Sequence, residues 1–222
     1  MSTTTNTTLP HPYYPQTLLL PHYIPPQLTM PEILTTFFGA VAVIFLASWT
    51  LATRRSLPVS TRLVFVWFVA CGFIHGVLEG YFAFNNREIA GQTFFLAELW
   101  KEYAYSDSRY MSSDSFVVIM EGITAALWGP GSFMVAYAIY TNSPARHILQ
   151  FLISTGQLYG DVLYYLTTLL EGAPHCSQSP FHFWFYFVFL NSFWIVIPLA
   201  LMVSSARVMY GALAKDIKSK KE

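Results

Sequence analysis

Five long apolar stretches, separated by short polar segments, set the pattern of the chain. They cover residues 33–53, 63–86, 115–145, 148–170 and 172–206, and the last opens with a loop before a helix from about Phe181. Each is long enough to cross a hydrocarbon core as a helix, at about 1.5 Å per residue. The pattern predicts an all-α polytopic membrane protein, a bundle of five transmembrane helices.

Lys and Arg gather on one side of this predicted bundle. With five helices, the loop after the first helix, the loop after the third and the C-terminal tail share a side. That side holds Arg54, Arg55, Arg62, Arg146, Arg207, Lys215, Lys218, Lys220 and Lys221. The positive-inside rule makes it cytoplasmic. The N-terminus and the long segment 85–114 are then lumenal, and four or six helices would remove this asymmetry.

The segment 85–114, between the second and third predicted helices, is too polar to span a membrane. Apolar side chains nevertheless recur in it near helical spacing, at Phe94, Phe95, Leu99, Trp100 and Tyr103. Such a segment can lie at the membrane interface, and we interpret it as a lid. The rest divides into a polar N-terminal segment (1–30), a five-helix membrane domain (31–210) and a basic cytoplasmic tail (211–222).

Composition supports a membrane protein, because 54% of the residues are hydrophobic and only 11% are charged. Soluble domains carry roughly 25% charged residues. The 12 basic and 12 acidic residues balance, and no basic cluster is interleaved with aromatics, so we expect no nucleic-acid partner. Cys71 lies in an apolar stretch and Cys176 in a polar loop, and we expect no disulfide, zinc site or thiol nucleophile.

Ionisable residues inside the apolar stretches are the candidate functional groups. His75 and Glu79 are four positions apart and share a helix face, while Glu121 and Asp161 are the charged residues of the third and fourth stretches. A charge near the bilayer centre costs roughly 2.5 to 3.5 kcal/mol and is normally kept for function. The structural alternative is pairing that only holds helices together. For Asp161 we give this structural alternative the same weight as the functional one, because the two glycines that precede it indicate close helix packing.

Asn191 and Trp194, three positions apart, share a face of the fifth predicted helix, within an aromatic stretch expected to serve mostly in packing. A Trp face beside carboxylates attracts cations. A dry cavity with histidine, carboxylates and Trp could stabilise positive charge on an apolar substrate and could also donate and remove protons. The chain has no phosphate loop, nucleophile elbow or metal motif.

Ten strings, in order along the chain, carry a family resemblance. They are Cys71–His75, Leu78–Gly80, Leu99–Ala104, Asp107–Tyr110, Met120–Glu121, Ile123–Ala125, Leu127–Pro130, Gly156–Gln157, Tyr159–Tyr164 and Phe183–Phe189, the last followed by Asn191 and Trp194. The chain resembles the emopamil-binding protein (EXPERA) family from about His11 to Pro198, with the EXPERA-like part at about 60–205.

The resemblance implies a 3β-hydroxysteroid Δ8,Δ7-isomerase of sterol biosynthesis in the endoplasmic reticulum membrane. In that reaction an acid protonates C9 of the sterol double bond, a carbocation forms at C8, and a base removes a proton from C7. No cofactor and no metal are needed. The implied partners are a sterol substrate, the lipid bilayer and amphiphilic amines, whose protonated form imitates the cation. The resemblance also allows a homodimer.

Matching motifs place two sets of residues at the site. The implied catalytic residues are His75, Glu79, Glu121, Asn191 and Trp194. The implied substrate-binding and lid residues are Thr124, Trp100, Tyr103, Asp107, Arg109, Asp161, Trp128 and Tyr164. We expect Glu121 and the pair of His75 and Glu79 to divide proton donation and removal, and Trp194 to face the cation. Which carboxyl starts protonated is left open by the sequence, as is the preferred sterol.

Two other functions compete with the isomerase. A non-catalytic sterol-binding or receptor-like membrane protein would use the same buried charges to hold ligands, and turnover discriminates between the two. A small transporter needs a polar pathway and often repeated halves, neither of which the sequence shows. The tail Lys218–Glu222 fits a lysine-based retrieval signal or a basic flank of the last helix. Asn6 begins a formal glycosylation sequon, which is short enough to be coincidental.

Overall fold

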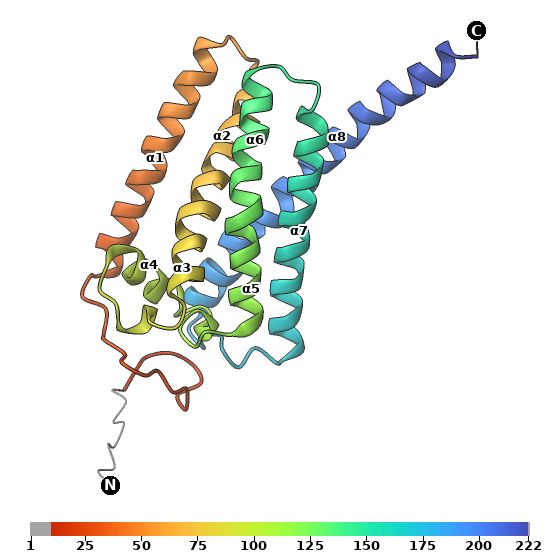
Figure 1. Ribbon diagram of the computed structural model, residues 1–222. Coiled ribbons are helices and arrows are strands. Elements are labelled where there is room, and N and C mark those ends of the chain that lie inside the picture. Colours follow the sequence, from red (N-terminus) through yellow and green to blue (C-terminus); the bar gives the residue numbers. More distant parts are fainter. Residues whose placement is uncertain (1–9, 222) are drawn as a thin grey trace.

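A computed structural model describes residues 10–221, and its regular structure is helical throughout (Figure 1). The elements are α1 (Met30–Arg54), α2 (Val59–Phe73), the π-helix η1 (Ile74–Glu79), α3 (Gly80–Asn85), the 3₁₀ helix η2 (Ile89–Gly91), α4 (Phe95–Tyr103), the 3₁₀ helix η3 (Ser108–Tyr110), α5 (Ser115–Ile123), the π-helix η4 (Thr124–Trp128), α6 (Gly129–Tyr140), α7 (Arg146–Leu170), the π-helix η5 (His182–Leu190) and α8 (Asn191–Ser219). Between residues 10 and 221 there is no strand, only an isolated bridge between Asp107 and Cys176. The all-α prediction is confirmed. Asn6 and its sequon lie outside the described residues.

Within residues 10–221, four helices are long and apolar enough to cross a membrane: α1, the continuous helix Val59–Asn85, the continuous helix Ser115–Tyr140, and His182–Ser219. The multi-pass prediction is therefore confirmed. The fourth expected span, α7, has 25 residues but is not among these four, because its composition is more polar. Three of its polar side chains, Gln150, Ser154 and Gln157, are buried against the bundle.

The helices pack as a bundle in which α7 runs along α8, α2 along α6, and α1 along α2 at the edge (Figure 1). The α1–α2 and α6–α7 turns lie at one end, and α8 extends beyond the bundle at that end. The segment that follows α3, with α4, lies at the other end beside the N-terminal segment. The segment before α1 and the end of α8 therefore lie at opposite ends of the bundle.

The predicted lid at 85–114 is a compact layer rather than a loose loop. Its helix α4 buries Ala97, Trp100 and Lys101. Ala97 and Trp100 belong to an apolar cluster that also contains the N-terminal residues Tyr13 and Leu20. The Tyr13 hydroxyl donates to the Lys101 carbonyl at 3.2 Å. The segment before α1, expected only to be polar, thus covers the lid from outside.

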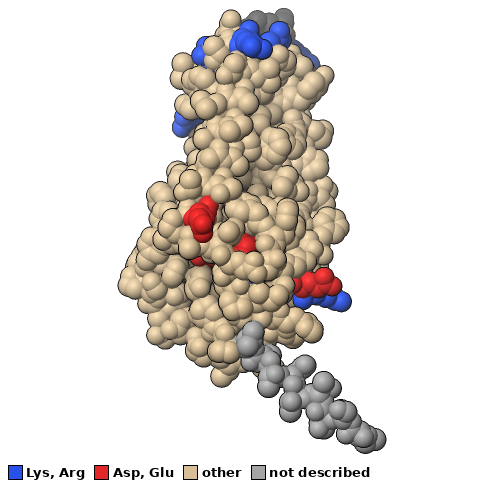
Figure 2. Space-filling model, turned by 90° about the vertical axis from the view of Figure 1, so that its left-hand side faces the viewer, with Lys and Arg blue, Asp and Glu red and all other residues tan. Residues whose placement is uncertain are grey.

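Charged side chains are rare on the side of the bundle that bears α1. Figure 2 shows most of the Lys and Arg surface of this face toward one end and a broad band of uncharged surface below it, with a few carboxylates and some further basic surface lower down. Many large apolar side chains are exposed there, including Phe38, Phe45 and Leu46 of α1. An exposed apolar band of this kind is what a helix bundle presents to lipid.

Candidate active site

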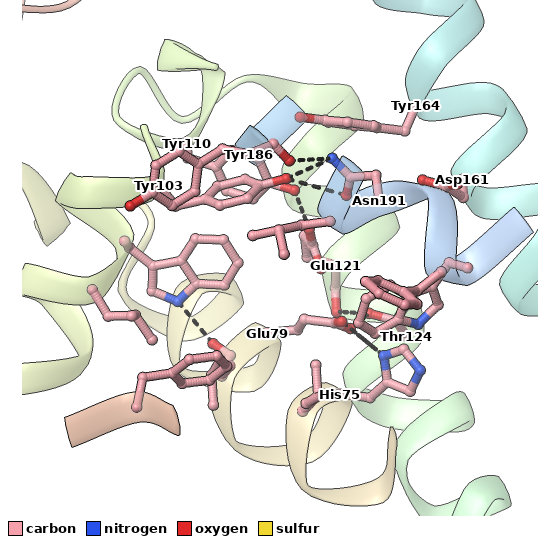
Figure 3. A pocket seen from close by; sticks show the side chains of 18 of the residues that line it. His75, Glu79, Tyr103, Tyr110, Glu121, Thr124, Asp161, Tyr164, Tyr186 and Asn191 are labelled. Atoms are coloured by element: carbon pink, nitrogen blue, oxygen red, sulfur yellow. Dashed lines mark hydrogen bonds and ion pairs between the residues drawn. The ribbon is translucent and has the colours of Figure 1, made fainter. Parts of the chain in front are cut away.

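A cavity of about 320 Å³ lies between the helices and is closed at one end by the lid (Figure 3). Its apolar wall includes α1 residues Leu34, Phe37, Phe38 and Val41. Polar groups enter from η1, α4, η3, α5, η4, α7, η5 and α8. The site is therefore assembled from segments spread over most of the chain.

The structure brings most of the predicted site residues into this cavity. Its lining contains His75, Glu79, Glu121, Thr124, Trp100, Tyr103, Asp161, Tyr164, Asn191 and Trp194. Asp107, Arg109 and Trp128 are not part of the lining.

Three π-helical segments carry or adjoin the polar groups of the site. His75 and Glu79 lie in η1, Thr124 begins η4, and η5 ends immediately before Asn191. Such segments are rare and often occur at functional sites, because the widened turn redirects side chains.

A close helix contact brings η1 and η4 together. A Cβ added at Gly129 would lie 3.1 Å from the backbone nitrogen of Gly76, so the absence of a side chain at Gly129 permits this approach. Across the contact, the Thr124 hydroxyl donates a short hydrogen bond to Glu79.

Glu79 is the most strongly hydrogen-bonded carboxylate of the cavity. His75 Nδ1 lies 2.7 Å from each of its two oxygens. The other ring nitrogen of His75, Nε2, is 3.0 Å from Gln157 Nε2 on α7. Protein groups therefore occupy both nitrogens of His75, although the residue lines the cavity beside Glu79.

Glu121 belongs to the same cluster. It is 5% exposed, accepts a hydrogen bond from the Tyr110 hydroxyl, and lies close enough to Glu79 to share a hydrogen bond. Tyr110 is itself fixed, because its ring stacks on Trp100 with centroids 4.7 Å apart. Trp100 in turn donates its indole N–H to the Leu78 carbonyl at 3.0 Å. The lid therefore positions one of the two carboxyl groups.

Asn191 and Trp194 form the facing wall. The Asn191 amide donates to the Tyr103 hydroxyl at 2.9 Å, which joins α8 to the lid. The Trp194 ring meets His75 edge to face, with centroids 6.3 Å apart, and its buried indole N–H has no hydrogen-bond partner among the described residues. An unpartnered buried donor beside a cavity is available to a ligand.

Asp161 lies on the α7 side of the cavity, apart from the two glutamates in Figure 3. Its buried Oδ2 has no partner within residues 10–221. Of the two glycines that precede it, Gly156 packs against the Trp128 ring, where a Cβ would approach to 2.4 Å, whereas Gly160 faces open space and lines the cavity. Close packing therefore accounts for Gly156 and Trp128 but not for Asp161.

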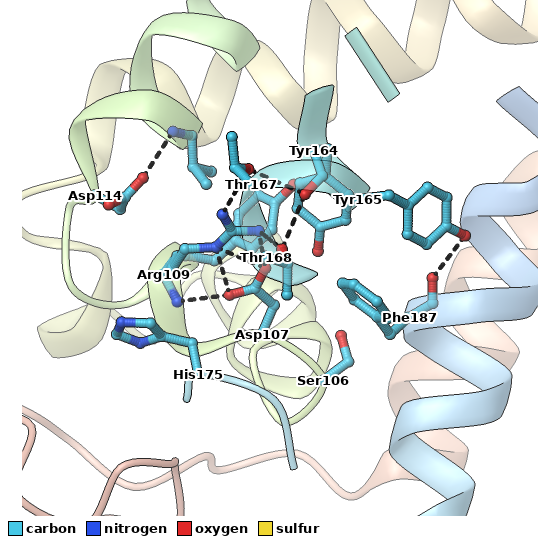
Figure 4. A network of polar contacts seen from close by, with 12 residues as sticks. Ser106, Asp107, Arg109, Asp114, Tyr164, Tyr165, Thr167, Thr168, His175 and Phe187 are labelled. Atoms are coloured by element: carbon cyan, nitrogen blue, oxygen red, sulfur yellow. Dashed lines mark hydrogen bonds and ion pairs between the residues drawn. The ribbon is translucent and has the colours of Figure 1, made fainter. Parts of the chain in front are cut away.

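Asp107 and Arg109 form a buried ion pair behind the cavity (Figure 4). Arg109 Nη2 lies 2.6 Å from Asp107 Oδ2, and the guanidinium also donates to Thr167 and Thr168 of α7. Burial lowers the pKa of Arg109, but the Asp107 carboxylate more than offsets this, so that the pKa stays above its ordinary value. The guanidinium lies 4.9 Å from the Tyr164 ring centre. The pair supports the cavity wall through that ring.

Some lining residues were not singled out from the sequence as site residues. Glu102, Tyr110 and Gln157 occur in the strings that carry the family resemblance, so a signal for them existed. Tyr186 donates to Glu102 at 2.9 Å, and burial raises the pKa of Glu102 above its ordinary value. The α1 wall carried no signal, because apolar residues occupy most positions of that stretch and nothing distinguishes those that line the cavity.

Both cysteines, Cys71 and Cys176, are free and buried. Across residues 10–221, no group of three His, Cys, Asp or Glu side chains is arranged to hold a metal ion.

Comparison with known proteins gives consistent matches. Residues 95–205 match the family model described as EXPERA (EXPanded EBP superfamily). The chain is 44% identical to a 3-beta-hydroxysteroid-Delta(8),Delta(7)-isomerase of Cavia porcellus, over 94% of this chain and 93% of that protein. It is also 44% identical to the protein of that name from Mus musculus, over 98% and 99% of the two chains. An isomeliandiol synthase of Ailanthus altissima is 37% identical, over 76% of this chain and 80% of its own.

Proposed function

This chain belongs to the EXPERA family, and from that membership we propose that it is an enzyme that moves the double bond of a 3β-hydroxysterol from the 8 to the 7 position. It is an intramolecular isomerase of sterol biosynthesis. The observation that carries the mechanism is the meeting of Glu79 and Glu121 within hydrogen-bonding reach in an apolar cavity.

The hydrogen bonds that Glu79 and Glu121 accept indicate which of the two carboxyl groups carries the proton that they share. Two adjacent buried carboxylates repel, so such a pair holds one proton between them. Glu79 accepts hydrogen bonds from both His75 and Thr124. Among residues 10–221 the Glu121 side chain accepts from the Tyr110 hydroxyl alone, and because fewer donors stabilise its charge, we place the shared proton on Glu121.

The reaction follows from that assignment. Glu121 donates its proton to C9, the electron pair of the double bond forms the new C–H bond, and a cation remains at C8. Glu79 then removes a proton from C7, and the electrons of that C–H bond form the new double bond between C7 and C8. The proton passes from Glu79 back to Glu121 across their hydrogen bond, which restores the site without a cofactor.

The surroundings favour the cation. Carboxylates preorganised in a water-poor cavity stabilise developing positive charge more than water would. The Trp194 ring adds a face of negative potential, an effect worth about 0.5 to 2 kcal/mol for a nearby cation. Asp161, with its unpartnered oxygen, accepts a hydrogen bond from a hydroxyl of the substrate.

The same features fit amphiphilic amines as ligands. A protonated amine with an apolar body places its positive charge where the C8 cation forms, and its apolar body packs against the α1 wall of the cavity. Ligands that imitate a transition state bind more tightly than substrates do.

In the membrane, α7 joins the other four long helices as a transmembrane span, the fourth in chain order, because its 25 residues match α1 in length and its residues Gln150, Ser154 and Gln157 are buried in the bundle. Five spans put the N-terminus and lid in the lumen of the endoplasmic reticulum and the basic C-terminus in the cytoplasm. Protease treatment of sealed microsomes carrying terminal epitopes tests this. Protection of the N-terminal epitope and loss of the C-terminal one are expected, whereas identical behaviour would indicate an even number of spans.

Turnover of zymostenol to lathosterol by the purified protein tests the enzyme itself. Wild type should convert the sterol, Glu121→Gln should lose activity by about 10²- to 10⁴-fold, and Glu171→Gln, which changes an exposed glutamate at the end of α7, should not. A wild-type protein that binds amines without turnover would be a receptor-like sterol binder instead.

A further inference from the structure

Gln157 is a buried polar residue that the proposed proton transfers do not use. It lies on α7, is 3% exposed and lines the cavity behind His75. Its Nε2 is 3.0 Å from His75 Nε2, while its Oε1 is buried without a hydrogen-bond partner among residues 10–221. His75 is thus the site residue to which the Gln157 amide lies within hydrogen-bonding distance.

The contact restricts the protonation of His75. A carboxylate only accepts hydrogen bonds, so His75 Nδ1, at 2.7 Å from Glu79, carries a proton. His75 Nε2 is then either a lone pair that accepts from the amide N–H of Gln157, or a second N–H that needs an acceptor. The amide nitrogen faces Nε2, which corresponds to the neutral imidazole.

We propose that Gln157 is a positioning residue that holds His75 neutral, with its single proton on Nδ1 and directed at Glu79. An imidazolium would require the amide to turn over and present its oxygen. Gln157 therefore opposes protonation of His75 by presenting a donor where a charged ring needs an acceptor. The role in turnover rests on the proposed isomerase, whereas the control of the imidazole does not.

The consequence for the reaction lies in the basicity of Glu79. Beside a neutral imidazole, Glu79 receives one neutral hydrogen bond from the ring. Beside an imidazolium it would be paired with a full positive charge, which would make it a much weaker base toward C7. Gln157 thus acts on the substrate through His75 and Glu79 without touching the reacting atoms.

Other groups around His75 set the background for any pH effect. Its own helix contributes Cys71 and Glu79, α5 contributes Glu121, α7 contributes Asp161 to the same cavity, and α8 presents the neutral Trp194. All of these remain in place when only Gln157 is changed.

Replacement of Gln157 by groups of similar size separates donor, acceptor and packing effects. Gln157→Glu supplies oxygens only, and Gln157→Met removes both. Gln150 offers a matched control, because it is 1% exposed on the same face of α7, two turns away, and donates to the Leu201 carbonyl at 3.3 Å rather than to the site.

The first measurement is the ¹⁵N signal of the His75 ring in labelled full-length protein in detergent, assigned by its loss in His75→Ala. Wild type and Gln150→Glu should show one protonated and one unprotonated nitrogen at neutral pH, and Gln157→Glu should show two protonated nitrogens. Two protonated nitrogens in the wild type, or an unchanged ring in Gln157→Glu, would overturn the proposal. This result is independent of turnover.

The second measurement is the pH dependence of kcat. Gln157→Glu should move the acid-side midpoint upward by about one to three pH units, and Gln157→Met should lower kcat about tenfold with KM unchanged. Gln150→Met should leave the profile in place. If Gln157→Glu does not fold, the ¹⁵N pattern of the wild type and the kinetics of Gln157→Met still test the proposed role of Gln157. A Gln157→Met enzyme with wild-type kcat would remove the positioning role.

Discussion

His75 Nδ1 lies 2.7 Å from the carboxylate of Glu79, and the π-helical segment η1 holds both residues. Because Gln157 occupies the other ring nitrogen of His75, the imidazole does not present a free nitrogen to the cavity. The histidine therefore supports a carboxylate that lines the cavity, and in the proposed reaction it takes the place of the orienting residue behind a catalytic base.

This arrangement predicts unequal effects for substitutions at the two positions. Glu79→Gln should lower kcat by about 10²- to 10⁴-fold, since it removes the base itself. His75→Asn, which retains an N–H donor, should lose less activity than His75→Ala. Steady-state turnover of a Δ8 sterol in detergent measures all three. Equal loss in His75→Asn and His75→Ala, with both proteins folded, would instead make the imidazole a direct participant.

Glu121 should be the source of the proton added at C9. In D₂O the wild type is expected to place deuterium at C9 of the product, and Glu121→Gln should suppress both turnover and label. Tyr110→Phe removes only the hydroxyl that donates to Glu121 and keeps the ring stacked on Trp100. It should therefore lower kcat less than Glu121→Gln does. Mass spectrometry and NMR of the product give the position of the label, and label at C9 from Glu121→Gln at the wild-type rate would assign the acid elsewhere.

The ion pair of Asp107 and Arg109 should matter for stability more than for chemistry. Arg109→Met leaves Asp107 buried without its partner, a loss of about 3 to 5 kcal/mol in the free energy of unfolding. Adding Asp107→Leu to Arg109→Met removes the unpaired charge and should recover part of that loss. Thermal unfolding in detergent measures both proteins. A double variant less stable than Arg109→Met alone would show that the unpaired Asp107 carboxylate is not the source of the lost stability.

Gly156 should tolerate no side chain. A Cβ there would approach the Trp128 ring to 2.4 Å, so Gly156→Ala should cost about 1 to 3 kcal/mol in the free energy of unfolding. Gly160, four residues later on α7, has no atom within 4 Å of the corresponding position, and Gly160→Ala provides the matched control. Combining Gly156→Ala with Trp128→Leu should restore stability. Equal melting temperatures for the two alanine variants would show that the Trp128 ring moves aside freely.

Local patterns in the sequence predicted much of the architecture. Apolar runs identified the positions of all five long helices, because the length of such a run depends only on neighbouring residues. The same reasoning missed the nature of the lid, whose buried Lys101 and Glu98 look like solvent-exposed charges in the sequence. Their burial depends on the N-terminal segment, where backbone N–H groups of Gln27 and Leu28 donate to Glu98.

The sequence by itself determined the all-helical membrane class and the buried ionisable residues, because a charge within an apolar run is conspicuous without any knowledge of its neighbours. Only the tertiary structure decided what surrounds each group. It placed Gln157 against His75, Tyr110 against Glu121, and Arg109 behind Tyr164 rather than in the cavity. These pairs join different elements of the fold, and their chemistry depends on distances and on the direction of each hydrogen bond, neither of which the spacing of residues along a chain contains.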